Sequence, residues 1–470
     1  MMIESNLPIA VIGAGPVGLA AAAQIVSRGL VPVVFERGAS VGASLLEWSH
    51  VRVFSPWRYD IDASARSLLE ASGWNAPDET ELPTGGEIVD RYLQPLARLP
   101  QLAPHLNLNA VVTSITRRGL DKVSNAGRDE APFEIRWTDA HGSEQATLAR
   151  AVIDASGTWT QPNPMGIDGL PVLGERDVAD HIAYGIPDVL GTARQTYAGK
   201  TVLVVGSGHS AINAALALLS LQDQDPGTRV LWALRRNRIE KLRGGGLNDQ
   251  LPERGALGLA ASNAIDAGRL QMLAPFAATR LAPSDNGVAV MGTLGQTQVT
   301  LTVDRIVVAT GFRPDLRMLS ELRVAIDPAT EAPPSLSPLI DPNVHSCGTV
   351  PPHGVVELTQ PEAGFYIVGS KSYGRAPTFL MATGYEQVRS IVAELAGDHA
   401  AARQVQLVLP ETGVCSVTPA SADAAGCCGG PAVDSTTSCC AADEIAKAEG
   451  ESGCGCGSSA TQPAKIPEPA

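Results

Sequence analysis

Residues 8–36 read PIAVIGAGPVGLAAAAQIVSRGLVPVVFE. A short β-branched run comes first, followed by glycines in the spacing G-x-G-x-x-G, an Ala-rich stretch and a second apolar run that ends in Glu36. This order predicts a strand–helix–strand unit in which Gly13 forms the tight turn, Gly15 lets the backbone approach a pyrophosphate and Gly18 lets the helix pack on the sheet. Glu36 falls where a carboxylate accepts hydrogen bonds from a ribose. The unit predicts a dinucleotide site, and a Gly-rich turn of another α/β protein is the alternative.

Length and charge limit the classes of protein to which the chain can belong. Its 470 residues are enough for two or three domains, each with its own core. The formal net charge of −14 does not favour binding to nucleic acid or to an acidic membrane. The N-terminal apolar stretch is the strand–helix–strand unit itself, so we expect neither a signal peptide nor a membrane span. We therefore expect an acidic, soluble, cytoplasmic protein, and the sequence leaves its oligomeric state open.

A second strand–turn–helix unit occupies residues 201–219, which read TVLVVGSGHSAINAALALL. Its turn has the spacing G-x-G-x-x-A, and the strand after it, 229–234, ends in two arginines instead of a carboxylate. Guanidinium groups bind phosphate where a carboxylate would repel it, so this strand end favours NADPH over NADH. A solvated basic patch is the alternative. The candidate residues of this second site are Gly206, Ser207, Gly208, Ser210, Arg235 and Arg236.

The two units show how the chain is divided into domains. Each unit lies upstream of a strand that runs into an A-[ST]-G turn, at 155–157 and at 309–311. This repetition predicts an α/β protein with two Rossmann-like dinucleotide-binding domains, the second inserted into the first. We place the first domain at 1–160 and 305–405 and the second at 165–300. A strand over 364–368 and a helix over 378–395 are expected to complete the first sheet.

Three further segments carry predictions of local structure. Residues 107–115 are predicted to form one strand, and residues 133–137 and 145–148 to form a hairpin. A helix is predicted over 84–98, kinked or ended near Pro95 because proline removes a helical hydrogen bond.

The tail from residue 411 to residue 470 differs in composition from the rest of the chain. It has no aromatic residue, no Leu and no Arg, and it holds seven of the eight cysteines. Such a segment cannot bury enough apolar surface to offset the entropy of ordering, so we predict disorder. Paired thiolates suit Cu(I), Zn(II) or trivalent arsenic, and a tail whose cysteines do nothing specific is the alternative. The candidate ligands of a soft metal or metalloid are Cys427, Cys428, Cys439, Cys440, Cys454 and Cys456.

With both fingerprints and both A-[ST]-G turns in place, residues 5–400 resemble the flavoproteins with two dinucleotide-binding domains. Within that group the chain resembles the class B flavin monooxygenases, and it is most similar to the flavin monooxygenases associated with bacterial arsenic resistance. The latter similarity rests on the runs His50–Trp57, Gly244–Arg254, His345–Gly354 and Ser370–Phe379. The resemblance implies an FAD-binding domain, formed by 1–160 and 305–405, with an NADPH-binding domain inserted into it.

The resemblance also implies which residues hold the cofactors. FAD would bind at Gly13, Gly15, Gly18 and Glu36, and NADPH at the six candidate residues of the second unit. Val112 and Asp315 are further cofactor-binding candidates.

The implied chemistry is that of a monooxygenase. NADPH would pass a hydride to FAD, and the reduced flavin would add molecular oxygen to give a C4a-hydroperoxide, which oxygenates a small soft nucleophile or a ketone. Arg or His near the flavin could stabilise the negative charge of this species. The candidate residues around the flavin are His50, Arg52, Tyr373 and Arg375; for each, an ordinary surface or packed position is the alternative.

Some features depart from this pattern or fit other classes. The hinge motif F-x-G-x-x-x-H-(S)-x-x-(Y/W) of the monooxygenases survives as Gly174, His181 and Tyr184, without its Phe and with a longer spacing. Disulfide reductases share the architecture but need a cysteine pair beside the flavin, and neither 42–48 nor 165–300 contains a cysteine.

Two other functions stay open. A reductase could act through the tail thiols on a disulfide or a thiol-bound metal, and the tail could bind a soft metal or metalloid without catalysis. Cys347, the one cysteine before residue 415, is expected to be a buried and inert thiol, with a substrate-facing thiol as the alternative.

Overall fold

A five-stranded parallel sheet forms the centre of the first domain in the computed structural model, which describes residues 6–236, 252–343, 350–376 and 379–407. Its strands are β1 (Ile9–Ile12), β2 (Pro32–Phe35), β3 (Leu106–Asn107), β7 (Ala151–Asp154) and β16 (Phe365–Ile367). Their order is β16-β7-β1-β2-β3. The strand predicted near residue 365 therefore completes the sheet at one edge, as expected, and β1 lies in the middle.

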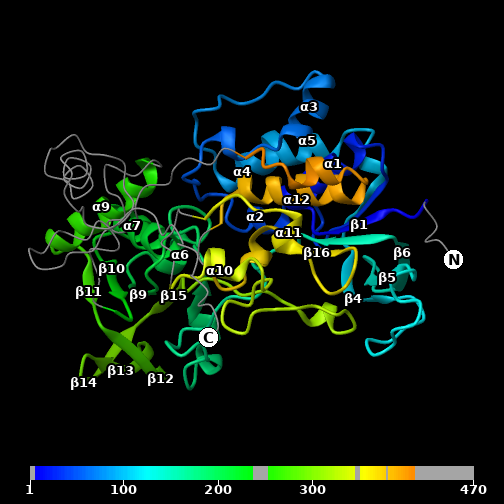
Figure 1. Cartoon of the computed structure of the whole chain (residues 1–470). Helices are drawn as coiled ribbons and strands as arrows, with labels where there is room; N and C mark the ends of the chain where they lie inside the picture. Colours follow the sequence, from blue (N-terminus) through cyan, green and yellow to red (C-terminus); the bar gives the residue numbers. More distant parts are fainter. Residues whose placement is uncertain (1–5, 237–251, 344–349, 377–378, 408–470) are drawn as a thin grey trace, which may run out of the picture. The chain divides into compact units, whose positions relative to one another are not determined.

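Helices cover one face of this sheet, and a small antiparallel sheet covers the other (Figure 1). The longer helices are α1 (Pro16–Ser27), α3 (Ala63–Ala71) and α12 (Met381–Leu395), and the antiparallel strands are β4 (Val111–Arg117), β5 (Phe133–Thr138) and β6 (Glu144–Ala149). Ile9 and Val11 of β1 pack against the helices, whereas Ala10 and Ile12 pack against β4–β6. The two-residue period of a strand thus builds two separate cores.

Short helical segments connect these layers. They are α2 (Ala43–Leu46), η1 (Trp57–Tyr59), α4 (Gly85–Ile88), η2 (Val89–Leu93), α5 (Gln94–Ala97), η3 (Ala103–His105), η6 (Arg317–Leu319), α10 (Ser337–Ile340), α11 (Val355–Leu358), η7 (Gly369–Tyr373) and α13 (His399–Arg403).

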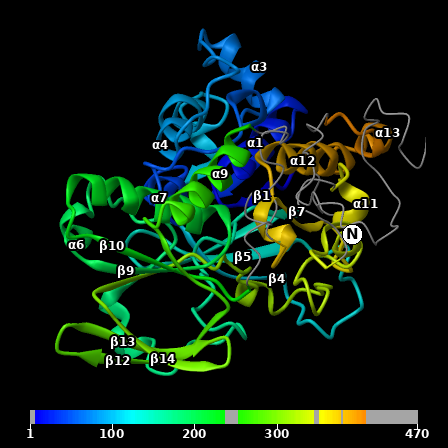
Figure 2. The same cartoon turned by 90° about the vertical axis from the view of Figure 1, so that its left-hand side faces the viewer.

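The second domain repeats the same three layers (Figure 2). Its parallel sheet has the order β11-β10-β9-β15-β8, with α7 and α9 on one face and the antiparallel sheet β12–β14 on the other. Val202 and Val204 of β9 face the helices, and Leu203 and Val205 face β12–β14. The elements are η4 (Arg176–His181), β8 (Ile182–Tyr184), α6 (Arg194–Tyr197), β9 (Thr201–Val205), α7 (His209–Gln224), β10 (Arg229–Ala233), α9 (Pro252–Asp266), β11 (Gln271–Leu273), β12 (Phe276–Ser284), β13 (Gly287–Leu294), β14 (Thr297–Val303) and β15 (Arg305–Val308).

The second sheet extends further along the chain than the proposed domain limits. Strand β15 pairs with β9 and β8, so this sheet ends at Val308 and not before residue 300. The chain returns to the first domain only after the A-T-G turn at 309–311. The prediction placed β15 with the first domain because residues 299–315 echo the strand and A-S-G turn at 150–159.

Two local predictions need correction. Residues 107–115 do not form one strand, because Asn109 has a φ of 53° and divides β3 of the parallel sheet from β4 of the antiparallel sheet. Of the two outcomes predicted for the helix over 84–98, an end near Pro95 is wrong, because Pro95 falls in the first turn of α5, where a missing N–H is tolerated. The irregularity near Pro95 is the π-helical turn η2, which directly precedes α5. The predicted hairpin over β5 and β6 is confirmed.

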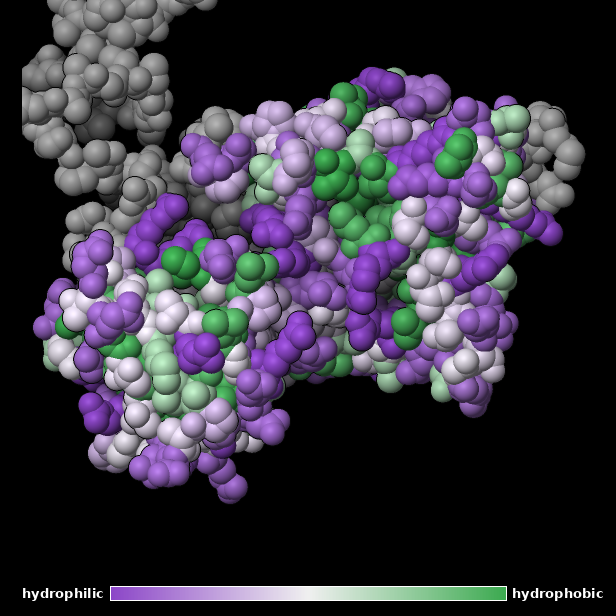
Figure 3. Space-filling view, turned by 90° about the horizontal axis from the view of Figure 1, so that it is seen from below, coloured by the Kyte–Doolittle hydropathy of each residue, from purple (hydrophilic) through white to green (hydrophobic). Residues whose placement is uncertain are grey.

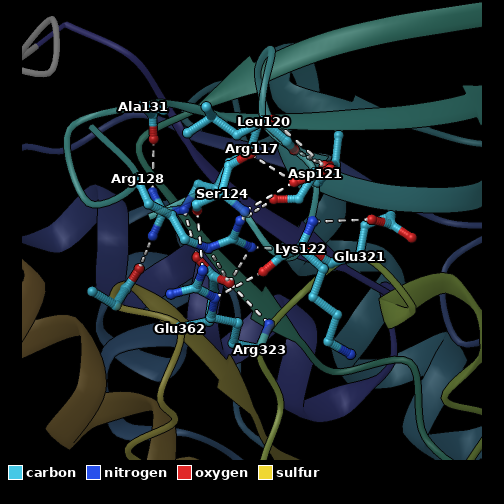
Figure 4. A network of polar contacts seen from close by, with 12 residues as sticks. Arg117, Leu120, Asp121, Lys122, Ser124, Arg128, Ala131, Glu321, Arg323 and Glu362 are labelled. Atoms are coloured by element: carbon cyan, nitrogen blue, oxygen red, sulfur yellow. Dashed lines mark hydrogen bonds and ion pairs between the residues drawn. The ribbon is translucent and has the colours of Figure 1, made fainter. Parts of the chain in front are cut away.

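A buried charge network fastens the 118–131 loop to the first domain (Figure 4). Glu362 accepts hydrogen bonds from Arg117 Nε at 2.8 Å and from Arg128 Nη2 at 2.7 Å, and all three side chains are buried. Its Oε2 also accepts from the backbone N–H of Arg323 at 2.9 Å. Arg117 lies over the Phe133 ring at 3.8 Å. The Glu362 carboxylate thus joins β4 to the 118–131 loop and to the loop at Arg323, and Arg117 adds the contact with β5.

Several predictions lie outside the described residues. They concern the disordered tail 411–470 with its six candidate metal ligands, Cys347, and most of the run Gly244–Arg254. Among the described helices, none combines the length and apolarity needed to cross a bilayer. On the face drawn in Figure 3, hydrophilic and hydrophobic side chains are intermingled.

Candidate functional site

The first fingerprint forms an open turn at the carboxyl end of β1. Gly13 has a φ of +97°, and a Cβ built on Gly18 would lie 1.9 Å from the carbonyl oxygen of Gly13, so glycine is needed at both positions. No described atom lies within 4 Å of a Cβ built on Gly15, and α1 has no side-chain cap at its N-terminus. The turn therefore leaves space and free backbone N–H groups for an anion at the start of α1.

Glu36 holds the fingerprint turn from the end of β2. Its Oε2 accepts the backbone N–H of Ala14 at 2.8 Å, and its Oε1 accepts that of Gly38 at 2.8 Å. The side chain is 8% exposed. Each carboxylate oxygen keeps a further acceptor position, so the prediction that Glu36 also accepts from a ribose stays open. The structure adds a role that the motif alone did not indicate, which is to tie two turns together.

The second fingerprint has the same design at the carboxyl end of β9. A Cβ on Gly206 would lie 2.3 Å from the carbonyl oxygen of Ala309, whereas no described atom lies within 4 Å of a Cβ on Gly208. Helix α7 begins there without a side-chain cap. Ser207 is exposed and Ser210 half-buried beside this helix start. Arg235 and Arg236 are exposed directly after β10, the neighbouring strand, so both ends of the candidate site are accessible.

A buried ion pair lies at the carboxyl ends of β7 and β16. Lys371 Nζ donates to Asp154 Oδ2 at 2.7 Å and to Ser156 Oγ at 3.0 Å, and the hydroxyl of Ser156 donates to Asp154 Oδ1 at 2.6 Å. The side chains of Lys371 and Asp154 are 1% and 0% exposed. This buried ion pair therefore fixes the A-S-G turn of the first domain.

A second polar network holds the segment before α12. Gln387 accepts the backbone N–H of Gly369 at 2.7 Å and donates to Ser372 Oγ at 3.0 Å and to His353 Nε2 at 2.9 Å. His353 Nδ1 lies 3.0 Å from the carbonyl oxygen of Pro351, so these partners assign the proton to Nδ1. Burial lowers the pKa of His353, which keeps the ring neutral.

The four candidate residues around the flavin occupy two different segments. Tyr373 is buried, lies against the rings of His353 and Phe379 at 5.6 and 5.3 Å, and has its pKa raised by burial. Arg375 follows it and pairs with Glu331 at 2.7 Å. These contacts give Tyr373 a packing role and direct the Arg375 charge to a protein carboxylate.

His50 and Arg52 lie after α2, on an exposed stretch. The Arg52 guanidinium donates to the carbonyl oxygen of Leu82 and lies 3.9 Å from Glu87. Arg52 therefore contacts residues 82 and 87, whereas Tyr373 and Arg375 contact residues 331, 353 and 379. Their roles in chemistry stay predictions.

The remaining predicted positions have structural contacts of their own. Val112 is half-buried in β4 opposite Trp137. Asp315 pairs with Arg317 at 2.6 Å, and hydrogen bonds from Arg317 lower the pKa of Asp315 to about 2. In the hinge motif, Tyr184 donates to Glu175 at 2.6 Å, and His181 Nδ1 lies 3.0 Å from the carbonyl oxygen of Asp304.

An acidic cluster between α1, α3 and α12 was not anticipated. Asp60 is 0% exposed, accepts from Ser55 Oγ at 2.7 Å through Oδ1, and has no described hydrogen-bond partner for Oδ2. Burial raises the pKa of Asp60 to about 8 and that of Asp62 to about 6. Tyr385 of α12 donates to the carbonyl oxygen of Asp60 at 2.7 Å. Within the described ranges, no group of three or more His, Cys, Asp or Glu is placed to hold a metal ion.

Some of these residues had a signal in the sequence. Lys371 and Asp154 are single charges inside otherwise apolar or small-residue runs, 364–373 and 151–157, and such charges need a buried partner. The ring contact between Phe54 and His209, with centroids 5.3 Å apart, joins residues 155 positions apart and had no such signal.

A family model described as pyridine nucleotide-disulphide oxidoreductase matches residues 10–341. The flavin-containing monooxygenase FMO GS-OX-like 2 of Arabidopsis thaliana is 24% identical over 225 residues, which are 44% of this chain and 45% of the plant protein. The ferredoxin–NADP reductase of Lactiplantibacillus plantarum is 25% identical over 261 residues, 54% of this chain and 68% of that protein. The chain therefore spans less than half the length of the plant relative.

Solved structures show the same fold at low identity. The bacillithiol disulfide reductase Bdr of Bacillus cereus has a TM-score of 0.57 and 20% identity, covering 83% of this chain and 99% of that one. The ornithine N-hydroxylase of Kutzneria sp. 744, in a structure with reduced FAD, NADP+ and L-ornithine, has a TM-score of 0.56 and 16% identity, covering 84% and 100%. These likenesses confirm the two-domain α/β architecture.

Proposed function

The chain belongs to the pyridine nucleotide-disulphide oxidoreductase family, and on this premise we propose that this oxidoreductase is an FAD- and NADPH-dependent monooxygenase of a small molecule. The strongest support comes from the two glycine turns. Each is open at an uncapped helix N-terminus, and each follows the central strand of a parallel sheet. Because ligands of open α/β sheets bind at the carboxyl ends of the strands, two such turns suit two dinucleotides.

The two sites fit their cofactors by different charges. Gly13, Gly15 and Gly18 would hold the FAD pyrophosphate, and Glu36 would face the ribose. Gly206, Ser207, Gly208, Ser210, Arg235 and Arg236 would hold NADPH, with the arginines at the 2′-phosphate. Val112 and Asp315 are further proposed cofactor positions. Bound FAD would supply the two-electron exchange between NADPH and molecular oxygen.

The protein's part in this reaction is to position groups and to exclude water. Lys371 and Asp154 hold the A-S-G turn, and Gln387 holds Gly369, so the edge of the first sheet beside the proposed flavin site is fixed by buried bonds. A disulfide reductase would need a cysteine pair there, but Cys347 is the first cysteine of the sequence. This favours oxygen over a protein disulfide as the electron acceptor.

We place the substrate among small soft nucleophiles and ketones, with a trivalent arsenic compound as one soft nucleophile. The support is the similarity of runs such as His50–Trp57 and Ser370–Phe379 to the monooxygenases associated with arsenic resistance. Arg52 and His50 are the proposed sources of positive charge near the reacting oxygen, whereas the ion pair of Arg375 with Glu331 favours a structural role for that residue.

Rapid mixing of oxygen with the purified, NADPH-reduced flavoprotein tests the proposal. A transient flavin absorbance, distinct from the oxidised and reduced spectra, would support a monooxygenase if an amine, thioether, ketone or arsenical shortens the lifetime of the transient. Loss of flavin electrons to protein thiols under anaerobic conditions would instead support the reductase that acts through the tail.

The tail carries a separate proposal. Seven cysteines between 415 and 456, four of them in two vicinal pairs, favour binding of a soft metal or metalloid. Truncation before Glu411 should keep NADPH oxidation and abolish binding of trivalent arsenic or zinc, measured by dialysis. Unchanged binding in the truncated chain would refute the tail as the ligand. The scarcity of cysteine before residue 415 favours a cytoplasmic location.

A further inference from the structure

The two connections between the nucleotide domains are joined to each other along their length. Residue 162 of the first connection forms an antiparallel bridge with residue 312 of the second. Asn163 N donates to the carbonyl oxygen of Gly311 at 2.9 Å, and Arg313 N donates to that of Gln161 at 2.9 Å. The side chains of Arg313 and Asn163 are also bonded, Nε to Oδ1, at 2.8 Å. The connections therefore form one ribbon, which any motion between the domains must bend or twist.

Trp159 fastens this ribbon to both domains. Its indole Nε1 donates to Glu47 Oε2 at 2.7 Å, and its ring lies 6.4 Å from that of Trp48, both just after α2 of the first domain. On the ribbon, its ring lies 4.7 Å from that of Phe312 at an interplanar angle of 31°. On the second domain, a Cβ built on Gly185 would lie 3.0 Å from the Trp159 ring.

The positions of the two rings along the chain connect this cluster to the nucleotide sites. Trp159 comes two residues after the first A-[ST]-G turn, and Phe312 comes one residue after the second. The first turn is held by the buried pair Asp154–Lys371, and the second lies beside Gly206, where the carbonyl oxygen of Ala309 would clash with a Cβ. The stacked rings thus follow directly from the two turns that border the proposed cofactor sites.

From this arrangement we propose that Trp159, oriented by Glu47, is a positioning residue that keeps the nicotinamide and flavin sites in the relation needed for hydride transfer. The inference rests on the proposed function. A donor carbon and an acceptor must approach to about 3–3.5 Å for transfer, so small rotations at the ribbon would be costly. Stacking on Phe312 and contact at Gly185 restrict such rotations, and the bond to Glu47 fixes the indole plane. Neither side chain takes part in the chemistry.

Anaerobic flavin reduction in three variants tests the proposal. Trp159→Ala should slow reduction by saturating NADPH at least tenfold, whereas reduction by dithionite, which needs no second domain, should stay within twofold of the wild type. Glu47→Gln keeps an oxygen acceptor for the indole N–H, so its rate with NADPH should stay within twofold. Glu47→Ala lacks the acceptor and should be slowed about threefold. Trp74→Ala is the control. Trp74 is also half-buried and also donates its indole N–H, but its acceptor is the carbonyl oxygen of Arg91, which does not belong to the ribbon.

A second measurement does not depend on turnover. Small-angle scattering of the purified flavoprotein should give a larger radius of gyration for Trp159→Ala than for the wild type and for Trp74→Ala. Wild-type NADPH rates in folded Trp159→Ala, or equal slowing with NADPH and dithionite, would overturn the inference. If Trp159→Ala does not fold, Glu47→Ala decides, and a wild-type rate there overturns it. A wild-type protein that NADPH cannot reduce would instead refute the proposed function, and the scattering comparison would then decide on the ribbon alone.

Discussion

Replacement of Asp60 by Asn should change the pH dependence of folding. Asp60 is fully buried, receives one hydrogen bond from Ser55, and has no described partner for its second oxygen. Burial raises its pKa from 3.8 to about 8. The folded protein therefore binds a proton that the unfolded chain releases above pH 4, and stability must fall as the pH rises from about 4 to about 8.

The size of the effect follows from the pKa shift. One pKa unit corresponds to about 1.4 kcal/mol, so the Asp60 carboxyl should reduce the free energy of unfolding by about 3–4 kcal/mol between pH 5 and pH 8. Asn is neutral and nearly isosteric, and its oxygen can still accept from Ser55. Asp60→Asn should therefore remove this loss and be the more stable protein at pH 8.

Urea unfolding at pH 5 and pH 8 measures both quantities. The difference in unfolding free energy between Asp60→Asn and the wild type should grow by about 3–4 kcal/mol from pH 5 to pH 8. Asp285→Asn, in the exposed turn between β12 and β13, is the control and should follow the wild type at both values. If the difference for Asp60→Asn is the same at pH 5 and pH 8, the carboxyl does not carry a raised pKa and the reasoning fails.

Three further substitutions test other parts of the structure. Glu362→Gln leaves Arg117 and Arg128 buried without a charge partner, so urea unfolding should show a free energy of unfolding lower by about 3–5 kcal/mol. Glu321→Gln, on the exposed loop, is the control and should change this free energy little. Gly15→Ala has room for its methyl group but places it where a pyrophosphate would lie. We expect FAD affinity to fall at least tenfold in a fluorescence titration, with the melting temperature of the flavin-free protein unchanged; an unchanged affinity would mean that this turn does not bind the FAD phosphate. Arg235→Ala together with Arg236→Ala should raise KM for NADPH at least tenfold and leave KM for NADH within twofold; equal changes for both would mean that the arginines do not contact a 2′-phosphate.

The sequence predicted best what depends on neighbours along the chain. Both strand–turn–helix units, the hairpin over β5 and β6, and helix α12 follow from short-range patterns of glycine and apolar residues. The strand β15 was assigned to the first domain because its segment echoes the strand and A-S-G turn of that domain, and only its pairing with β9 and β8 decides. The division at Asn109 depended on a single backbone angle.

The candidate site was predicted less completely than the fold. Glycine positions follow from the motif, because they depend on local backbone geometry. The partners of Lys371 and Trp159 lie 217 and 112 positions away in the sequence, and no local pattern encodes such pairs. Glu36 shows an intermediate case, since the motif placed it correctly but did not indicate that its carboxylate binds two backbone N–H groups.

The pairing of Asn163 with Gly311 has a consequence for how such a chain can be built. Because the points of entry and exit of the second domain are adjacent, a gene segment encoding that domain could be gained, lost or exchanged without separating the ends that remain. A short turn joining residues 161 and 313 would close the first domain on itself. The second domain is thus an insertion that recombination could exchange as one unit, and the nicotinamide specificity would change with it.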